Sequence, residues 1–126
     1  MSTAQQELLE VSQQLLKAID AGDWNAYAAL CDERITCFEP EAEGHLVVGL
    51  AFHKFYFDLP GSGQRRLSSI SSPHIDVQGE VGVVCYVRLV QKETDCGPVT
   101  VASNETRIWR RTADGWKHTH FHRSPC

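Results

Sequence analysis

Residues 82–92 read Gly-Val-Val-Cys-Tyr-Val-Arg-Leu-Val-Gln-Lys, and this run predicts a long strand in a sheet. β-Branched and aromatic residues of this kind are typical of strands. Similar runs occupy residues 66–78, 99–111 and 116–124. Turn-forming segments at 79–80, 95–98 and 114–115 separate the four runs, which is the pattern of antiparallel hairpins. The second half of the chain is therefore predicted to form an antiparallel meander.

The first half of the chain predicts helices. Apolar residues recur at helical spacing from Leu8 to Ile19, Ser2 or Thr3 can cap this helix, and Gly22 can end it. Asp23 can cap a second, short helix that runs to Cys31. Short strands are expected at 35–38 and 45–48, a third helical piece at 50–57, and a loop at 60–63.

Helices followed by a meander define the α+β class. We expect a strongly curved sheet that wraps around the long N-terminal helix and encloses a cone-shaped cavity. The length of 126 residues fits one domain, so residues 1–126 are assigned to a single unit.

Composition excludes several classes of partner. The net charge of −4 argues against non-specific binding to nucleic acid or to an anionic membrane surface. No stretch approaches the roughly 20 apolar residues of a membrane span, and the first residues do not resemble a secretory signal. Five cysteines without a Cys-x-x-Cys pair favour free thiols, so a cytoplasmic location is expected.

Three arginines stand in otherwise apolar or aromatic strand sequence. They are Arg88, Arg107 and Arg123, one on each of three successive predicted strands. Arginine is costly to bury without a partner, and its planar fork matches a carboxylate or phosphate. One interpretation is a cavity that holds an anion; the other is three surface arginines whose stems cover apolar area. The pattern alone does not decide between them.

The last predicted strand carries alternating ring side chains, which are Trp116, His118, His120 and His122. Alternation places them on one face. Three histidines in a row along a strand spread over roughly 13 Å, so they do not converge as zinc ligands do. We therefore expect a half-polar or interfacial face, no metal and no cofactor.

Other residues could also carry chemistry. His53 among aromatic residues could act as an acid, a base or a ligand donor, or it could be an ordinary core histidine. Tyr27 could reach the same cavity or could simply pack between helix and sheet. Glu39 and Glu41 flank Pro40, where a solvated turn is favoured over an acid–base pair. No nucleophile elbow and no glycine-rich phosphate loop occurs, so no catalytic residue is assigned.

The order of several segments resembles the association (hub) domain of calcium/calmodulin-dependent protein kinase II, within the nuclear transport factor 2-like (cystatin-like) superfamily of cone-shaped α+β folds. The likeness runs from about Leu8 to Ser124. It rests on residues 38–42 (Phe-Glu-Pro-Glu-Ala), 52–57 (Phe-His-Lys-Phe-Tyr-Phe), 73–75 (Pro-His-Ile), 86–89 (Tyr-Val-Arg-Leu), 105–109 (Glu-Thr-Arg-Ile-Trp) and 120–124 (His-Phe-His-Arg-Ser).

The resemblance implies assembly of many copies of the chain into stacked rings. It also implies an arginine-lined pocket that takes a small carboxylate. The pocket positions that it assigns in this sequence are Tyr27, His53, Arg88, Arg107 and Arg123.

The sequence has none of the kinase signatures, such as a His-Arg-Asp catalytic loop or Asp-Phe-Gly. Kinase activity and calmodulin binding are therefore not expected of it. Lys54 stands where an arginine is common in the family. The loop 58–63 lacks the bulky aromatic residue that some members carry there, so the resemblance does not extend to gating by this loop. One alternative is a small enzyme of the isomerase or cyclase type that acts on a small acidic substrate, since relatives of this fold run such chemistry in the same cavity. Another is a plain binding module for a small organic acid. The candidate pocket residues include no obvious strong base, which favours the hub.

Overall fold

A computed structural model describes residues 1–126 and contains three α-helices, one 3₁₀ helix and one six-stranded sheet. The elements follow in the order α1 (Thr3–Ala21), α2 (Trp24–Leu30), β1 (Cys31–Phe38), η1 (Pro40–Ala42), β2 (Val47–Val48), α3 (Ala51–Phe57), β3 (Arg66–Gln78), β4 (Val81–Thr94), β5 (Gly97–Thr112) and β6 (Gly115–Pro125). The prediction of an α+β fold is confirmed.

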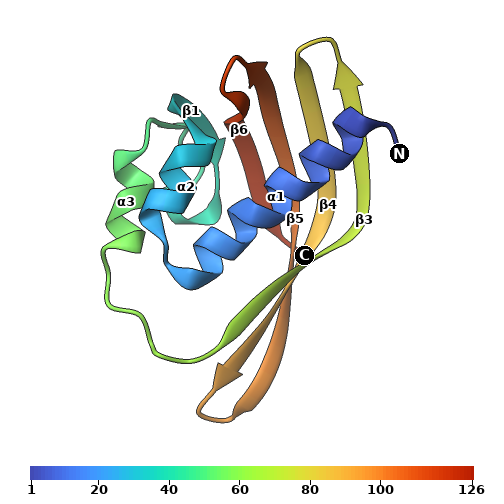
Figure 1. Ribbon diagram of the computed structural model, residues 1–126. Coiled ribbons are helices and arrows are strands. Elements are labelled where there is room, and N and C mark those ends of the chain that lie inside the picture. The colour runs from blue at the N-terminus through green and yellow to red at the C-terminus, as the bar shows by residue number, and fades with distance from the viewer.

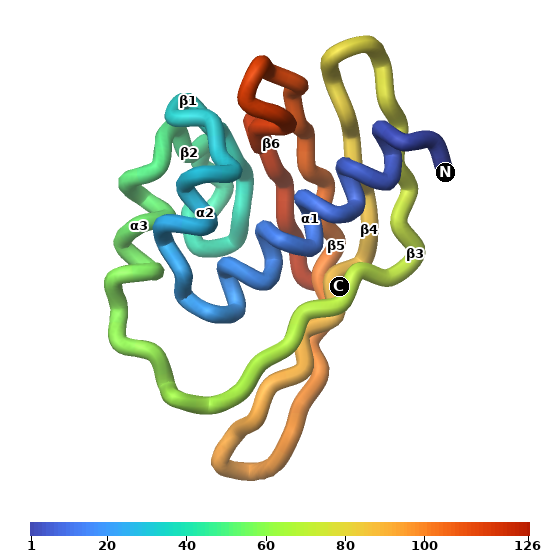
Figure 2. Tube along the Cα trace, in the orientation of Figure 1, coloured from blue at the N-terminus to red at the C-terminus, as the bar shows by residue number.

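The sheet has the strand order β2-β1-β6-β5-β4-β3. β3 to β6 form the expected antiparallel meander, and β1 joins it by pairing parallel to β6. Figure 1 shows α1 lying across one face of the curved sheet, with α2 and α3 beside the β1 end. The connection from α3 to β3 passes below α1 to the opposite edge of the sheet (Figure 2). No helix is long and apolar enough to cross a membrane.

The long helix α1 is fixed by its ends and by one apolar stripe. The Ser2 side chain accepts a hydrogen bond from the backbone N–H of Gln5, and Gln5 Oε1 accepts one from the backbone N–H of Ser2, which completes a capping box. Gly22 ends the helix in the left-handed conformation. The buried face includes Leu8, Leu15 and Leu16, at the helical spacing that the sequence predicted.

A bulge in β6 changes which side chains face inward. Ile108 pairs with His120 but Trp109 pairs with His118, so Thr119 is an extra residue in β6. An extra residue reverses the inward and outward alternation that follows it. The prediction that His118, His120 and His122 share one face with Trp116 is therefore wrong.

Trp116 and His118 are buried before the bulge, whereas Phe121 is buried after it. His120 instead lies on the outer face, where its Nδ1 is 2.7 Å from the Thr36 hydroxyl of β1. The bulge is thus the reason that Arg123, and not His122, reaches the inside of the sheet.

The remaining differences are local. β1 begins at Cys31 and not at Ile35, because pairing with β6 extends it. β2 keeps only Val47–Val48 of the expected strand 45–48. Cys85 lies half-buried on the outer face of β4. β3 has the predicted bounds and accommodates Pro73 because it is an edge strand with a register shift between Ser71 and His74.

Candidate functional site

A cavity of about 360 Å³ opens between the inner face of the sheet and the helices α2 and α3. Its wall contains Tyr27, His53, Arg88, Arg107 and Arg123, so the structure brings all five predicted pocket residues together. The other residues on its wall are Ile19, Glu39, Glu41, Tyr56, Phe57, Arg66, Lys92 and Phe121. We call this space the arginine cavity. A groove of about 410 Å³ on the outer face of the sheet contains no arginine.

Arg107 lies at the centre of the buried polar network. Only 1% of it is exposed, and its guanidinium donates to the Tyr86 hydroxyl over 2.8 Å and to Glu105 Oε1 over 2.8 Å. Its remaining edge faces His118 Nε2 at 3.4 Å, and its plane lies 4.7 Å from the ring centre of Phe121. Cation–π contact with this ring adds to the hydrogen bonds that hold the side chain.

Glu105 balances two of the arginines. Its Oε2 lies 3.5 Å from Arg88 Nη1, while Oε1 accepts hydrogen bonds from Arg107 and Tyr86. Burial alone would raise the pKa of Glu105, but the charges of Arg107 and Arg88 outweigh burial and hold this pKa at about 2. Glu105 and Arg107, two residues apart on β5, thus lie on the same face of the sheet and form an ion pair.

Arg88 has two further partners. Its Nη2 donates to Asp20 of α1 over 3.2 Å, and its Nε donates to the Ser68 hydroxyl of β3 over 3.0 Å. Asp20 also lies 3.3 Å from Arg66. Arg88 is thereby tied to three elements at once, so its position on the wall of the cavity is rigidly set.

Arg123 is held from the other side of the cavity. Its Nη2 donates to Glu41 Oε1 over 2.6 Å and lies 3.6 Å from Glu39 Oε2. The side chain of Arg123 is 23% exposed and that of Glu39 is 10% exposed. The interpretation of residues 39–41 as a solvated turn is therefore wrong for Glu39, whose carboxylate points inward. The alternation Ile35, Cys37, Glu39 along β1 was the sequence signal for this position.

His53 and Tyr27 complete the wall. His53 Nδ1 is 3.5 Å from Glu39 Oε1 and its Nε2 is 3.8 Å from Cys37 Sγ. Burial, with a contribution from the charge of Arg107, lowers the pKa of His53 to about 4, so its imidazole is neutral at pH 7. The Tyr27 ring packs 4.9 Å from Phe57 and 6.2 Å from His53, and burial raises its pKa above that of a free phenol.

The cavity wall carries more positive than negative charge. Arg66, Arg88, Lys92, Arg107 and Arg123 face two carboxylates, Glu39 and Glu41. Behind the wall, Asp20 and Glu105 compensate three of the arginines. Lys92 forms no ion pair. A site with an excess of cationic donors and an uncompensated ammonium is suited to a small anion.

Residues 4–126 match the model of the calcium/calmodulin-dependent protein kinase II association domain family. The chain is 44% identical over 123 residues to the rabbit (Oryctolagus cuniculus) calcium/calmodulin-dependent protein kinase type II subunit delta. The alignment covers 94% of the chain but only 23% of this relative. Drosophila melanogaster calcium/calmodulin-dependent protein kinase type II alpha chain is 41% identical over 98% of the chain and 24% of its own length. The chain thus spans about a quarter of the curated relatives it matches.

Solved structures agree with this match. The CaMKII hub homology domain of Chlamydomonas reinhardtii superposes with a TM-score of 0.94 and 47% identity, over 98% of this chain and 99% of that one. The CaMKII hub of S. rosetta gives a TM-score of 0.89 and 42% identity over 100% and 99% of the two chains.

More distant structures share the fold alone. An NTF2-like protein from Cytophaga hutchinsonii gives a TM-score of 0.79 at 16% identity and covers 100% of both chains. The expected nuclear transport factor 2-like fold is thus present. With matches along nearly its whole length to both the family model and the hub structures, the chain belongs to the calcium/calmodulin-dependent protein kinase II association domain family.

Proposed function

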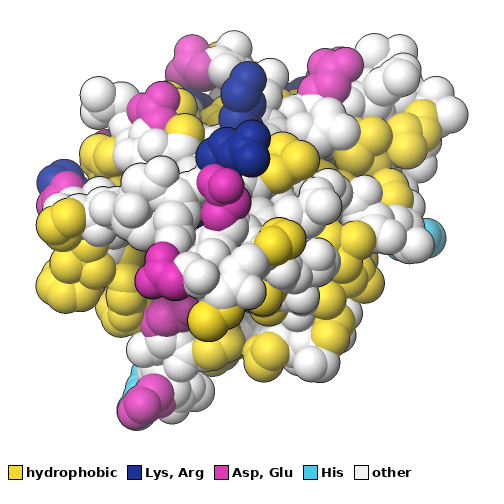
Figure 3. Space-filling model, turned by 90° about the horizontal axis from the view of Figure 1, so that it is seen from below, with side chains coloured by type: hydrophobic (Ala, Val, Ile, Leu, Met, Phe, Trp, Pro, Cys, Tyr) yellow, Lys and Arg dark blue, Asp and Glu magenta, His cyan; other side chains and the backbone are white.

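We propose that this chain is a self-associating hub that assembles into stacked, ring-shaped homo-oligomers. The observation that carries the proposal is the match to hub structures along 98% and 100% of the chain. The surface supports it, because large hydrophobic side chains such as Phe55, Leu59 and Leu67 are at least half exposed. Figure 3 shows hydrophobic side chains reaching the surface in several separate groups on one face. A contact between copies of the chain would remove such groups from water.

Light scattering coupled to size-exclusion chromatography tests the assembly. A hub of this kind should give a mass many times the chain mass of 14.1 kDa, because a ring forms when the same interface joins one copy to the next around a closed circle. The mass should stay constant on dilution through the micromolar range. A monomer or a simple dimer at micromolar concentration would contradict the proposal.

The second part of the proposal is that the arginine cavity binds a small carboxylate. The excess of cationic side chains on its wall supports this role, as does the lack of an acidic partner for Lys92. A carboxylate can accept paired hydrogen bonds from a guanidinium, and such charge-assisted bonds are strong. Neither a metal nor a cofactor is needed for this function. All five cysteines are free, in keeping with the proposed cytoplasmic location.

Thermal denaturation in the presence of small monocarboxylates tests the cavity. A ligand that binds only the folded state adds about 2.7 kcal/mol at a hundredfold excess over its dissociation constant. We expect the melting temperature to rise with carboxylates and to stay unchanged with the neutral amides of the same acids. Arg123→Ala should remove the rise, whereas Arg110→Ala, which breaks an exposed pair with Asp32 far from the cavity, should keep it. A rise that Arg123→Ala leaves intact would refute carboxylate binding at this site.

A small enzyme of the isomerase or cyclase type is the second candidate. Glu39 favours it, because this carboxylate lies in the cavity and burial, together with the charge of Glu41, raises its pKa towards that of a general base. The same carboxylate is already engaged by His53 and Arg123, which favours the binding role. Exchange of a carbon-bound proton of a small acidic ligand with deuterated solvent, lost in Glu39→Gln, would support the enzyme over the binding role.

A further inference from the structure

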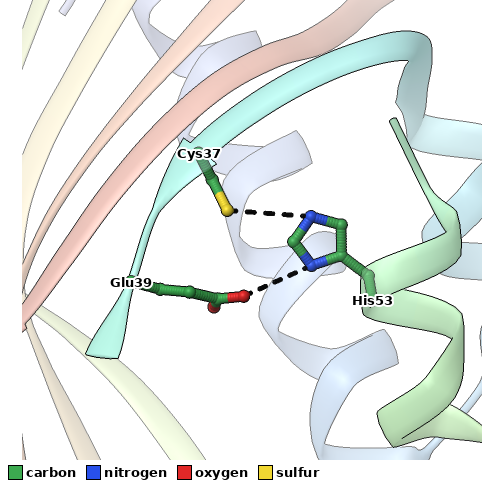
Figure 4. A group of neighbouring side chains, drawn as sticks. All are labelled: Cys37, Glu39 and His53. Carbon is green, nitrogen blue, oxygen red and sulfur yellow. Dashed lines mark hydrogen bonds and ion pairs between the residues drawn. The ribbon is translucent and has the colours of Figure 1, made fainter. Parts of the chain in front are cut away.

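Three potential metal ligands of different chemistry meet at the edge of the arginine cavity. Cys37 lies in β1, and Glu39, which directly follows β1, is on the same side. His53 faces both from α3. One ligand atom from each of the three residues lies within 4.8 Å of the other two. Figure 4 shows the imidazole between the thiol and the carboxylate, with one ring nitrogen towards each.

The separations between the three side chains are close to those of ligands around one ion. The Cys37 sulfur lies 3.8 Å from His53 Nε2, and Glu39 Oε1 lies 3.5 Å from Nδ1. A charge-assisted N–H···O bond is typically about 2.7–2.9 Å long. Ligands at about 2.0–2.3 Å from a tetrahedral zinc ion are, by contrast, roughly 3.3–3.7 Å from one another. Because the two distances involve different nitrogens of His53, only one of them can become a distance between two ligands of a single ion, and a small rotation must bring in the third ligand.

Access to the group differs between its members. Glu39 and His53 line the cavity, whereas Cys37 is fully buried and does not. This arrangement argues against a Cys–His–Glu catalytic triad, since a substrate in the cavity cannot reach the sulfur that would attack it. An ion can enter from the cavity between the carboxylate and the imidazole, and the sulfur then closes the inner side of its coordination shell.

We propose that Cys37, Glu39 and His53 together bind one zinc ion, with its fourth coordination position open to the arginine cavity. One sulfur, one nitrogen and one oxygen ligand suit zinc and do not suit magnesium or calcium, which prefer oxygen. A thiolate and a carboxylate neutralise the double positive charge of the ion. An ion binds only one nitrogen of the imidazole, so the ring or the Glu39 carboxylate rotates to bring the third ligand into place.

The neighbourhood allows this rearrangement. Arg123 keeps its stronger partner Glu41 when Glu39 turns to the ion, because the two contacts are made by different carboxylates. The positive charge of Arg107 disfavours a cation near His53. This charge is already compensated by Glu105, and the guanidinium donates hydrogen bonds to Glu105 and Tyr86. The proposal departs from the expectation of no metal, which considered only the histidines of β6. It does not depend on ring assembly or on carboxylate binding.

Metal binding to the full chain tests the proposal, with cobalt(II) as the spectroscopic probe and zinc as the competitor. We expect one cobalt ion per chain, a near-ultraviolet band from thiolate-to-cobalt charge transfer, and loss of the band when one equivalent of zinc is added. Cys37→Ala should abolish the band and weaken zinc binding at least tenfold. Glu39→Gln, which keeps the shape of the side chain, should weaken zinc binding and retain the band.

The chain offers a matched control. Cys31 is also buried, and its sulfur also lies 3.8 Å from a histidine nitrogen, that of His118, but no carboxylate completes that group. Cys31→Ala should leave the band and the zinc affinity unchanged, as should His122→Asn on the outer face of β6. Absence of stoichiometric binding would overturn the proposal, and so would zinc affinity that both Cys37→Ala and Glu39→Gln leave unchanged. A melting curve for each variant verifies that it is folded.

Discussion

At the scale of single residues, the stability of the buried network depends on Glu105. This carboxylate has no exposed side-chain surface and contacts Arg88, Arg107 and Tyr86. Removing one partner of a buried ion pair typically costs about 3–5 kcal/mol, because the other charge stays buried without compensation. Glu105 is therefore the residue whose loss should damage the cavity most while leaving its arginines in place.

We predict that Glu105→Gln lowers the free energy of unfolding by about 3 kcal/mol or more at pH 7. Urea denaturation followed by fluorescence measures this loss. Glu93→Gln is the matched control, since it removes a carboxylate that pairs with Arg65 on the surface, where such pairs contribute little. Equal stability of the two variants would show that the buried network is not what holds the sheet together.

The pH dependence of stability follows from the same carboxylate. Its folded-state pKa of about 2 lies below the pKa of about 4.3 expected for glutamate in the unfolded chain. The stabilisation is therefore complete above about pH 5 and is lost as the pH falls towards 2. Melting temperatures between pH 6 and pH 2.5 should fall steeply for the native chain and less steeply for Glu105→Gln. Parallel curves for the two proteins would contradict this assignment.

At the scale of elements, the helix α1 packs against β4 at Gly82, where β4 has no side chain. A Cβ atom at Gly82 would overlap the side chain of Leu8, which is fully buried. Overpacking of this kind typically costs about 1–3 kcal/mol. The sequence pattern placed both residues in their elements but could not show that they meet.

We predict that Gly82→Ala lowers the free energy of unfolding by about 1–3 kcal/mol and that the added Leu8→Ala recovers part of the loss. Denaturation of the single and double variants measures the coupling. Gly61→Ala is the control, because nothing lies within 4 Å of its added Cβ and its backbone is not left-handed. Additive effects of the two substitutions would mean that the contact between helix and strand is not the cause.

Elements with a regular period could be predicted from the sequence, and the irregular ones could not. β3 was predicted with its observed bounds, 66–78, and α1 with Gly22 at its end, while its first cap was left open between Ser2 and Thr3. The prediction that His120 shares a face with His118 was wrong because the bulge at Thr119 depends on pairing with two different strands, β1 and β5. The five pocket residues were assigned by resemblance to a family, whereas the strand pattern alone had left the arginines open between cavity and surface.

The side chains that pair with the cavity arginines could be predicted only in part from the sequence. Glu105 could be placed on the face of Arg107 by counting two residues along one strand. Asp20 and Ser68, which hold Arg88, come from elements that lie 68 and 20 residues away in the chain. Contacts at that sequence separation depend on the curvature of the whole sheet, which no local pattern encodes.

At the scale of the whole molecule, the β4–β5 hairpin extends beyond the helix that covers the rest of the sheet (Figure 1). Val101 pairs with Val90, which is buried, so Val99 and Val101 continue the inner face of the sheet. They are nevertheless 44% and 46% exposed, because α1 does not reach them. Neighbouring apolar side chains are unexpected on the inner face of a hairpin that stays in water. We therefore expect another copy of the chain to cover Val99 and Val101.

We predict that Val99→Lys combined with Val101→Lys lowers the mass of the assembly and leaves each chain folded. The reason is that two ammonium groups cannot be buried in an apolar contact without partners, whereas on a free hairpin they remain hydrated. Light scattering gives the mass, and far-ultraviolet circular dichroism gives the fold. Thr100→Lys is the matched control, because Thr100 is exposed on the opposite face of the same strand. If the double variant keeps the full mass while Thr100→Lys reduces it, the outer face and not the inner one joins the copies.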